Sequence, residues 1–174
     1  NMAVDGGHLI MTINEVKELG LSTEQHQRFV RPFLGSAEFI RGAIRYCLWI
    51  EDEYLNDAQA IPSISSRIES VREMRLGSAN TATIADAKNP HRFSQVRQGG
   101  HKQALIVPRV SSESREYLPV GALGSYQIVN DNAYAIYDAP LWSLALIASR
   151  IHIAWIAAVC GKMKTDYRYS RYLG

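Results

Sequence analysis

The stretch PLWSLALIASRIHIAWIAAVCGKMKTDYRYSR, residues 140–171, decides how the rest of the chain is interpreted. It begins with a proline, which suits the first turn of a helix, and then stays almost wholly apolar for about five turns. Gly161 is placed where a glycine commonly ends a helix. Directly after it the chain becomes basic, aromatic and rich in hydroxyl groups. This order predicts a buried helix followed by a strand that presents a surface for polyanions.

The apolar part, residues 141–160, is nearly long enough to cross a bilayer. Arg150 and His152 lie at its centre, however, and an arginine at mid-bilayer costs about 3 kcal/mol. We therefore predict a core helix and no membrane partner. The N-terminus has no charged region followed by an apolar run and a cleavage site, so we expect no secretory signal and a cytoplasmic location.

The length of 174 residues suits a single domain, and we predict one domain over residues 1–174. Residues 1–60 hold five Lys or Arg and nine Asp or Glu, a net charge of −4, whereas residues 61–174 hold fourteen and eight, a net charge of +6. This asymmetry hints at a face for nucleic acid. Cys47 and Cys160 both lie in apolar runs, which is typical of buried free thiols.

Short helices are expected near the N-terminus: one is capped by Thr12 or Asn14 and runs through Leu19, and the next is capped within residues 22–25 and runs to about Val30. Residues 38–40 and 45–50 read as two strands joined by a turn at Arg41-Gly42. Pro62 begins a longer helix whose arginines alternate with glutamates, a mixture typical of an exposed face. In that helix one stripe at helical spacing is formed by Ile64, Ile68, Val71 and Arg75.

The second half of the chain is richer in strands. They are predicted within residues 104–107, 109–117, 126–129 and 133–138. Together with the apolar stretch, they predict an α+β fold in which a mixed or antiparallel twisted sheet packs against C-terminal apolar helices, with short N-terminal helices before it.

We find no catalytic constellation, no cofactor-binding motif and no metal-ligand spacing in the sequence. The five histidines are isolated from one another, and His152 reads as a core histidine whose polar atoms are satisfied. The acidic run Glu51-Asp52-Glu53 does not share one helical face and is typical of a solvated turn.

Two segments combine arginine or lysine with hydroxyl groups. Basic side chains attract phosphates, while Ser and Tyr hydroxyls fix the position of the sugar-phosphate chain. The predicted DNA-binding residues are Arg109, Ser111, Ser112, Ser114 and Arg115 in the first segment, and Lys162, Lys164, Tyr167, Arg168, Tyr169, Ser170 and Arg171 in the second. The alternative is structural: the arginines pair with Glu113, Glu116 or Asp166, and the tyrosines brace the sheet.

A third, weaker candidate is the loop of residues 92–102, which is basic and contains glycines. Side chains that read bases need not belong to either segment, and the irregular stretches 78–102 and 121–132 are plausible places for them.

Several long motifs, in this order, resemble one family. They are DGGHLIMT (5–12), FVRPFLGSAEFIRG (29–42), RYCLWIED (45–52), PRVSSESREYLPVG (108–121) and SRIHIAWIAAVCGKMKTDYRYS (149–170). The chain is similar over nearly its whole length to the target-recognition domain of the MmeI-like, class I DNA methyltransferases of restriction-modification and phage-defence systems.

The resemblance implies a module that reads duplex DNA for a methyltransferase domain in the same polypeptide, which uses S-adenosylmethionine to methylate adenine N6. The motifs of that catalytic domain are absent here, since Asn89-Pro90 is followed by His91. We therefore expect a non-enzymatic part of a larger protein, without a cofactor of its own. The alternative is an assembly module that docks the methyltransferase domain and does not read bases itself.

Overall fold

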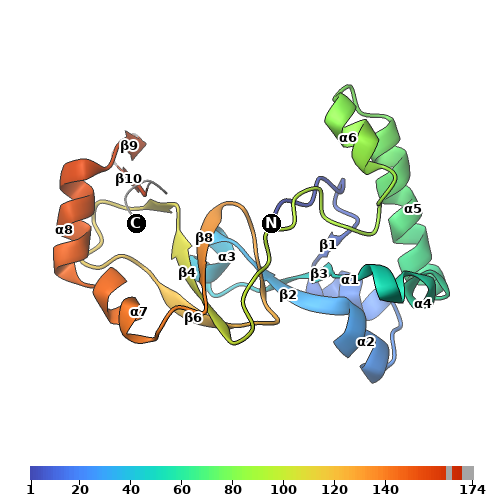
Figure 1. Ribbon diagram of the computed structural model, residues 1–174, viewed down its shortest axis with the longest axis horizontal. Helices are drawn as coiled ribbons and strands as arrows, with labels where there is room; N and C mark the ends of the chain where they lie inside the picture. The colour runs from blue at the N-terminus through green and yellow to red at the C-terminus, as the bar shows by residue number, and fades with distance from the viewer. Residues whose placement is uncertain (164–165, 170–174) are drawn as a thin grey trace. The chain divides into compact units, whose positions relative to one another are not determined.

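The computed structural model describes residues 1–163 and 166–169 (Figure 1). The chain divides into two compact units, and each of them is built from two separate stretches of sequence. Unit 1 comprises residues 1–33 and 44–98, and unit 2 comprises residues 34–43 and 99–174.

Unit 1 combines short strands with helices. Its elements are β1 (Ile10–Met11), α1 (Ile13–Glu18), α2 (Thr23–Phe29), most of β2 (Val30–Leu34), β3 (Arg45–Leu48), the 3-10 helix η1 (Asp52–Tyr54), α4 (Leu55–Gln59), α5 (Pro62–Leu76) and α6 (Thr81–Asp86). In the sheet of this unit β3 lies between β1 and β2 and is antiparallel to both. The short helices α1 and α2 begin at the predicted places, because Thr12 and Ser22 each form a capping box.

Helix α5 buries the whole predicted stripe, including the arginine at its end, Arg75. Ile64, Ile68 and Val71 are fully buried, and so is Arg75, with 1% of its surface exposed. The Arg75 guanidinium donates all five of its N–H groups to backbone carbonyls at 2.7–3.0 Å. The acceptors are the carbonyls of Ala3, Val4, Asp86, Asn89 and Arg92. The prediction that the arginines of this helix share a solvent-exposed face is therefore wrong for Arg75.

Unit 2 contains most of the strands. Its elements are α3 (Ser36–Arg41), β4 (Gln103–Pro108), β5 (Val110–Ser111), β6 (Gly121–Gly124), β7 (Ile128–Val129), β8 (Ala133–Tyr137), α7 (Trp142–Ile147), α8 (Arg150–Val159), β9 (Lys162–Met163) and β10 (Asp166–Arg168). Central strand β4 pairs antiparallel with β6 on one side and with β8 on the other. A second antiparallel group has the order β5–β10–β9.

Helix α3 replaces the strand predicted at residues 38–40. The Glu38 carboxylate accepts the Gly35 N–H at 3.0 Å, and Gly42 ends the helix with a φ of 68°. In unit 2, Phe39 of this helix contacts Gly121 so closely that a Cβ there would lie 2.6 Å from Phe39 Cε2. A side chain at position 121 would therefore force the Phe39 ring to shift.

The apolar stretch that follows Pro140 forms two helices and not one. Helix α7 ends before Ser149, whose hydroxyl accepts the His152 N–H at 3.1 Å and caps α8. Ile147 of α7 and Ile156 of α8 join β4 residues Leu105 and Val107 in one buried cluster. Sheet-against-helix packing of this kind, with short helices near the N-terminus, confirms the predicted α+β fold class.

Candidate nucleic-acid interface

The two hydroxyl-and-arginine segments are joined by strand pairing in unit 2, although the 46 residues from 116 to 161 separate them in sequence (β10 is labelled in Figure 1). Strand β10 pairs antiparallel with β5, so that Tyr167 lies opposite Ser111 and Arg168 opposite Val110. One further hydrogen bond, from the Tyr169 N–H to the Arg109 carbonyl at 2.9 Å, extends the pairing. Both segments were proposed separately from sequence, and the backbone now joins them into one surface.

Arg109 is held at the start of this surface. Its guanidinium donates to the Asp131 carbonyl at 2.9 Å and lies 5.5 Å from the centre of the Tyr134 ring, which is a cation–π arrangement. Its backbone N–H donates to the Ser36 hydroxyl at 3.3 Å. Arg109 is therefore half-buried and oriented, with part of its donor set already committed within the protein.

The serines of the first segment differ in their exposure. Ser111 is 3% exposed, and its hydroxyl has no hydrogen-bond partner among the described residues. Ser112 and Ser114 lie in the turn after β5, where their hydroxyl oxygens are 2.9 Å apart. Arg115, at the end of that turn, is exposed. Ser112, Ser114 and Arg115 are thus placed to meet a ligand, whereas Ser111 is covered by protein.

The tyrosines of the second segment support the surface from inside. Tyr167 and Tyr169 are half-buried and pack against the core cluster of unit 2. The Tyr169 ring lies 5.8 Å from the Tyr134 ring, and burial raises the pKa of its phenol. Arg168 is exposed between them. This alternation follows from the strand geometry, in which successive side chains point to opposite faces.

The structural alternative expected Arg115 and Arg168 to pair with nearby acidic residues, but one of those acids pairs with a different arginine. Glu116 pairs with Arg150 at 3.1 Å. Within residues 1–163 and 166–169, neither Arg115 nor Arg168 has an ion-pair partner. Both side chains are exposed, which makes them candidates for contact with a polyanion. Unit 2 as a whole has nine Lys or Arg and six Asp or Glu in its sequence, whereas unit 1 has ten and eleven.

Part of the predicted site lies outside the described residues. Lys164, Ser170 and Arg171 lie outside the described residues. For Lys162 only the backbone is described, where it pairs with Tyr167 across β9 and β10.

The weaker candidate loop of residues 92–102 is anchored at both ends. Arg92 pairs with Asp52 at 3.2 Å in unit 1. In unit 2, the Asp138 carboxylate accepts the N–H groups of Lys102 and His101 at 2.9 and 3.1 Å. These hydrogen bonds lower the pKa of Asp138, with that from Lys102 contributing most.

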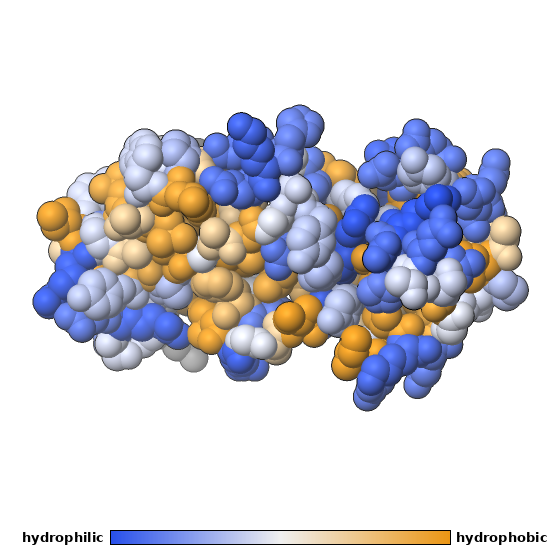
Figure 2. Space-filling view, turned by 90° about the horizontal axis from the view of Figure 1, so that it is seen from below, coloured by the Kyte–Doolittle hydropathy of each residue, from blue (hydrophilic) through white to orange (hydrophobic). Residues whose placement is uncertain are grey.

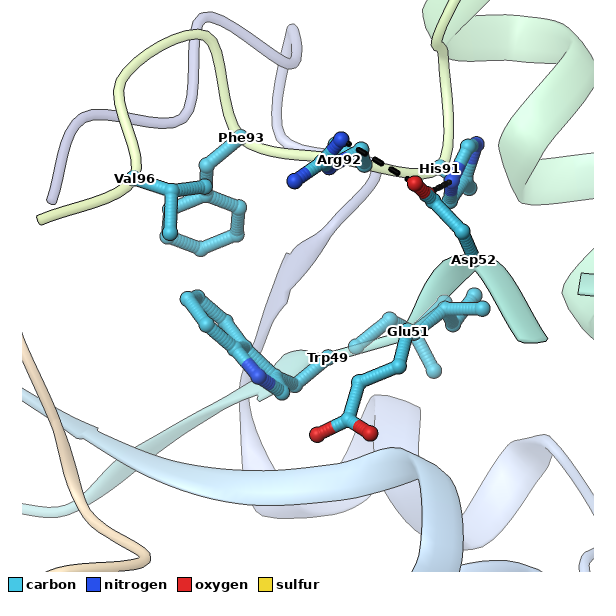
Figure 3. Close-up of a pocket in the computed structure, with 9 residues that line it drawn as sticks. Trp49, Glu51, Asp52, His91, Arg92, Phe93 and Val96 are labelled. Atoms are coloured by element: carbon cyan, nitrogen blue, oxygen red, sulfur yellow. Dashed lines mark hydrogen bonds and ion pairs between the residues drawn. The ribbon is translucent and has the colours of Figure 1, made fainter. Parts of the chain in front are cut away.

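Sequence reasoning missed a hollow in unit 1 of about 130 Å³, shown in Figure 3. The Trp49 and Phe93 rings face it, in an edge-to-face contact at 5.5 Å. Asp52, interpreted above as part of a solvated turn, accepts from His91 Nε2 at 2.8 Å, and this hydrogen bond is the main reason why the pKa of Asp52 is lowered. His91 is 4% exposed, and while its Nε2 is partnered, its Nδ1 has no hydrogen-bond partner among the described residues. The sequence offered no signal for this pairing across 39 residues.

The prediction for His152 is only half right. The ring is half-buried and stacks on Trp155 at 5.9 Å, and burial lowers its pKa. Its Nε2 atom has no hydrogen-bond partner among the described residues, so the polar atoms are not all satisfied.

Neither a metal cluster nor a membrane helix is found in the described part of the chain. Residues 1–163 and 166–169 contain no group of three or more His, Cys, Asp or Glu side chains that would hold a metal ion. No helix formed by these residues is long and apolar enough to cross a membrane.

Comparisons with known proteins agree with one another. DNA methyltransferase A of Bacillus subtilis (strain 168) is 37% identical over 170 residues, which are 98% of this chain and 19% of that protein. A solved structure of the Type IIL restriction-modification enzyme MmeI in complex with DNA superposes with a TM-score of 0.88 at 30% identity, over 98% of this chain and 23% of that one. The chain thus spans about a fifth of the length of these relatives. The family model described as "MmeI, target recognition domain" matches residues 1–174, and the chain belongs to this family of target-recognition domains.

Proposed function

We propose that this chain recognises a short duplex DNA sequence as the target-recognition module of a site-specific DNA methyltransferase in a restriction-modification system. The observation that carries the proposal is the pairing of β5 with β10, which joins two basic, hydroxyl-bearing segments into one surface. The solved complex of the relative MmeI with DNA supports it. The chain itself performs no catalysis in this proposal and needs no cofactor.

Each exposed group on this surface has a role that follows from its chemistry. Arg115 and Arg168 supply charge for two phosphates, and the Ser112 and Ser114 hydroxyls help to fix the position of the sugar-phosphate backbone. Lys162, Lys164, Ser170 and Arg171 extend this role along the second segment. The exposed arginines are also able to read guanine through O6 and N7 if they reach the major groove.

For the longer polypeptide we propose methylation of adenine N6 with S-adenosylmethionine. The similarity to DNA methyltransferase A supports a methyltransferase, and the resemblance to the MmeI-like enzymes extends this to adenine. The base would have to leave the stack to reach the catalytic domain, so recognition must hold the flanking duplex in place. Sequencing the methylated bases in cells that express the full-length protein tests both the modified base and the site.

Salt dependence of DNA binding tests the surface directly. In the full-length protein, Arg115→Gln and Arg168→Gln should each weaken binding and reduce the slope of log affinity against log salt by about 0.9. The control is Arg72→Gln, an exposed arginine of α5 in unit 1 whose neighbour is Glu69 at 3.6 Å. It removes the same charge and should leave the slope nearly unchanged.

The assembly-module alternative makes the opposite prediction. If the two substitutions in unit 2 leave both affinity and salt slope at the level of the Arg72→Gln control, the β5–β10 surface does not contact DNA. Normal folding of each variant, checked by circular dichroism, makes such a result decisive.

A further inference from the structure

Helix α8 is apolar on both of its faces. Ile153 and Ile156 point into unit 2, with 9% and 0% of their surfaces exposed. On the other face Ile151 is 83% exposed and Trp155 is 41% exposed. A helix that is hydrophobic all round is normally buried on every side, so this outer face implies a partner.

Helix α7 extends the outer apolar surface. Trp142 is 67% exposed, and two leucines beside it, Leu141 and Leu146, are about as exposed, at 59% and 60%. Figure 2 shows hydrophobic residues gathered in the left half of the view, from the place of α7 in Figure 1 toward the centre. We call this surface the α7–α8 face and define it by the exposed side chains of Leu141, Trp142, Leu146, Ile151 and Trp155. Contiguous exposed apolar surfaces of this kind mark sites of protein contact.

The charge of the α7–α8 face makes it unsuitable for DNA. Among residues 141–160 the sequence has one charged side chain, Arg150, and the structure pairs it with Glu116 at 3.1 Å. Burial lowers the pKa of His152, which disfavours a positive charge on its imidazole. Phosphate binding requires unpaired cations, so the face fits an apolar protein surface and not a polyanion.

The relatives indicate where such a surface would come from. Their chains are about five times as long as the matched region, and one of them is named as a DNA methyltransferase. We propose that the methyltransferase part of the longer polypeptide packs on the α7–α8 face. This rests on the proposed function in one respect, namely that the chain belongs to a methyltransferase polypeptide. A dry apolar contact holds two domains at a fixed distance from each other. A recognition module needs such a contact, because the bases it reads lie at a fixed distance from the base that is modified.

Tryptophan footprinting of the full-length protein tests the contact without any mutation. A Trp142 side chain that stays 67% exposed should be labelled by hydroxyl radicals nearly as fast as in the unfolded chain. At the centre of an interface, its labelling should instead be slowed about tenfold or more, because interface cores are desolvated. Labelling at the exposed rate overturns the proposal.

Dilution separates the proposed occupant from a second copy of the chain. Protection by another part of the same polypeptide is independent of protein concentration. If the protection of Trp142 is lost when the protein is diluted to a monomer, as followed by light scattering, the occupant is a second copy and the proposal is wrong.

A substitution gives the functional consequence. Ile151→Glu should restore rapid labelling of Trp142 and lower the methylation rate at saturating DNA by about tenfold or more, while the affinity for DNA and its salt slope stay unchanged. The matched control is Leu76→Glu at the end of α5, an equally apolar and 56% exposed position in unit 1, which should change neither quantity. An Ile151→Glu protein with unchanged labelling and unchanged methylation contradicts the proposal.

This experiment also distinguishes the interface from DNA recognition. Loss of the salt-dependent affinity at Arg115 and Arg168 tests the proposed function alone, whereas Trp142 labelling is measured without DNA. A protected Trp142 in a protein that does not bind DNA would refute the function and support the interface.

Discussion

The buried guanidinium of Arg75 should be the most sensitive single position of unit 1. Its five N–H donors meet five backbone carbonyls, from the N-terminal residues Ala3 and Val4 and from the turn of residues 86–92. Burial lowers the pKa of this guanidinium, but arginine remains protonated at any ordinary pH. Arg75→Met keeps most of the side-chain volume and removes every donor.

The magnitude follows from the carbonyls that the substitution leaves behind. A buried acceptor without a donor costs about 1–3 kcal/mol, and water will reach some of the five after local relaxation. Two or three unsatisfied carbonyls therefore imply a loss of about 3–5 kcal/mol, reduced in part because methionine avoids the cost of burying a charge. This corresponds to an increase of about two to three and a half orders of magnitude in the opening equilibrium.

Hydrogen exchange measured by mass spectrometry localises the effect within the full-length protein. Peptides that cover residues 1–5 and 86–97 should exchange about a hundredfold faster or more in Arg75→Met. Arg72→Met provides the control, because Arg72 lies one turn earlier and its side chain is 44% exposed, so less than about 0.5 kcal/mol is expected. Equal exchange in the two variants would show that the five hydrogen bonds do not hold these segments.

Two further predictions concern unit 2. Gly121→Ala should destabilise the protein by about 1–3 kcal/mol in urea unfolding, because the new Cβ would lie 2.6 Å from Phe39 Cε2. Phe39→Leu in the same chain should recover part of this loss, and strict additivity of the two substitutions would argue against the contact. Hydrogen bonds from the backbone N–H groups of Lys102 and His101 lower the pKa of Asp138 in the folded protein. The stability that these bonds contribute is therefore fully present above the unfolded pKa of about 3.9. It is lost as the pH falls through the lower folded pKa. Between about pH 5 and pH 2 the urea midpoint should therefore fall more steeply in the wild type than in Asp138→Asn, and parallel curves would refute the assignment.

Local signals in the sequence predicted much of the fold. Capping residues such as Thr12 and Ser22 located the first helices, and the spacing of apolar residues located α5 and its buried stripe. These features depend on neighbours within one or two turns of helix, which a sequence displays directly.

The errors arose where local propensity competed with capping. Phe39 and Ile40 favour a strand, but the carboxylate of Glu38 and the positive φ of Gly42 stabilise a helix around them. The cap at Ser149, which divides α7 from α8, is a residue type that predicts a helix start, yet the surrounding apolar run obscured it.

Contacts between residues that are far apart in the sequence could not be predicted from it. The composition of the two basic segments showed that each suits a polyanion, but not that Tyr167 lies opposite Ser111. Nor did it show that Ser111 is buried or that His91 meets Asp52. Such pairings depend on the closure of loops of tens of residues, for which no local pattern exists.

The interrupted path of the chain through unit 2 affects how specificities can be exchanged between relatives. Residues 34–43 belong to unit 2, although the sequence on both sides of them belongs to unit 1. A crossover near residue 98 would transfer the strands and C-terminal helices from one parent but keep α3 from the other. In the hybrid, Phe39 would meet residue 121 of the other parent. Ser36 would likewise meet that parent's residues at positions 109 and 132, in place of Arg109 and Asn132. New specificities built by recombination should therefore survive most often when residues 34–43 are inherited together with residues 99–174.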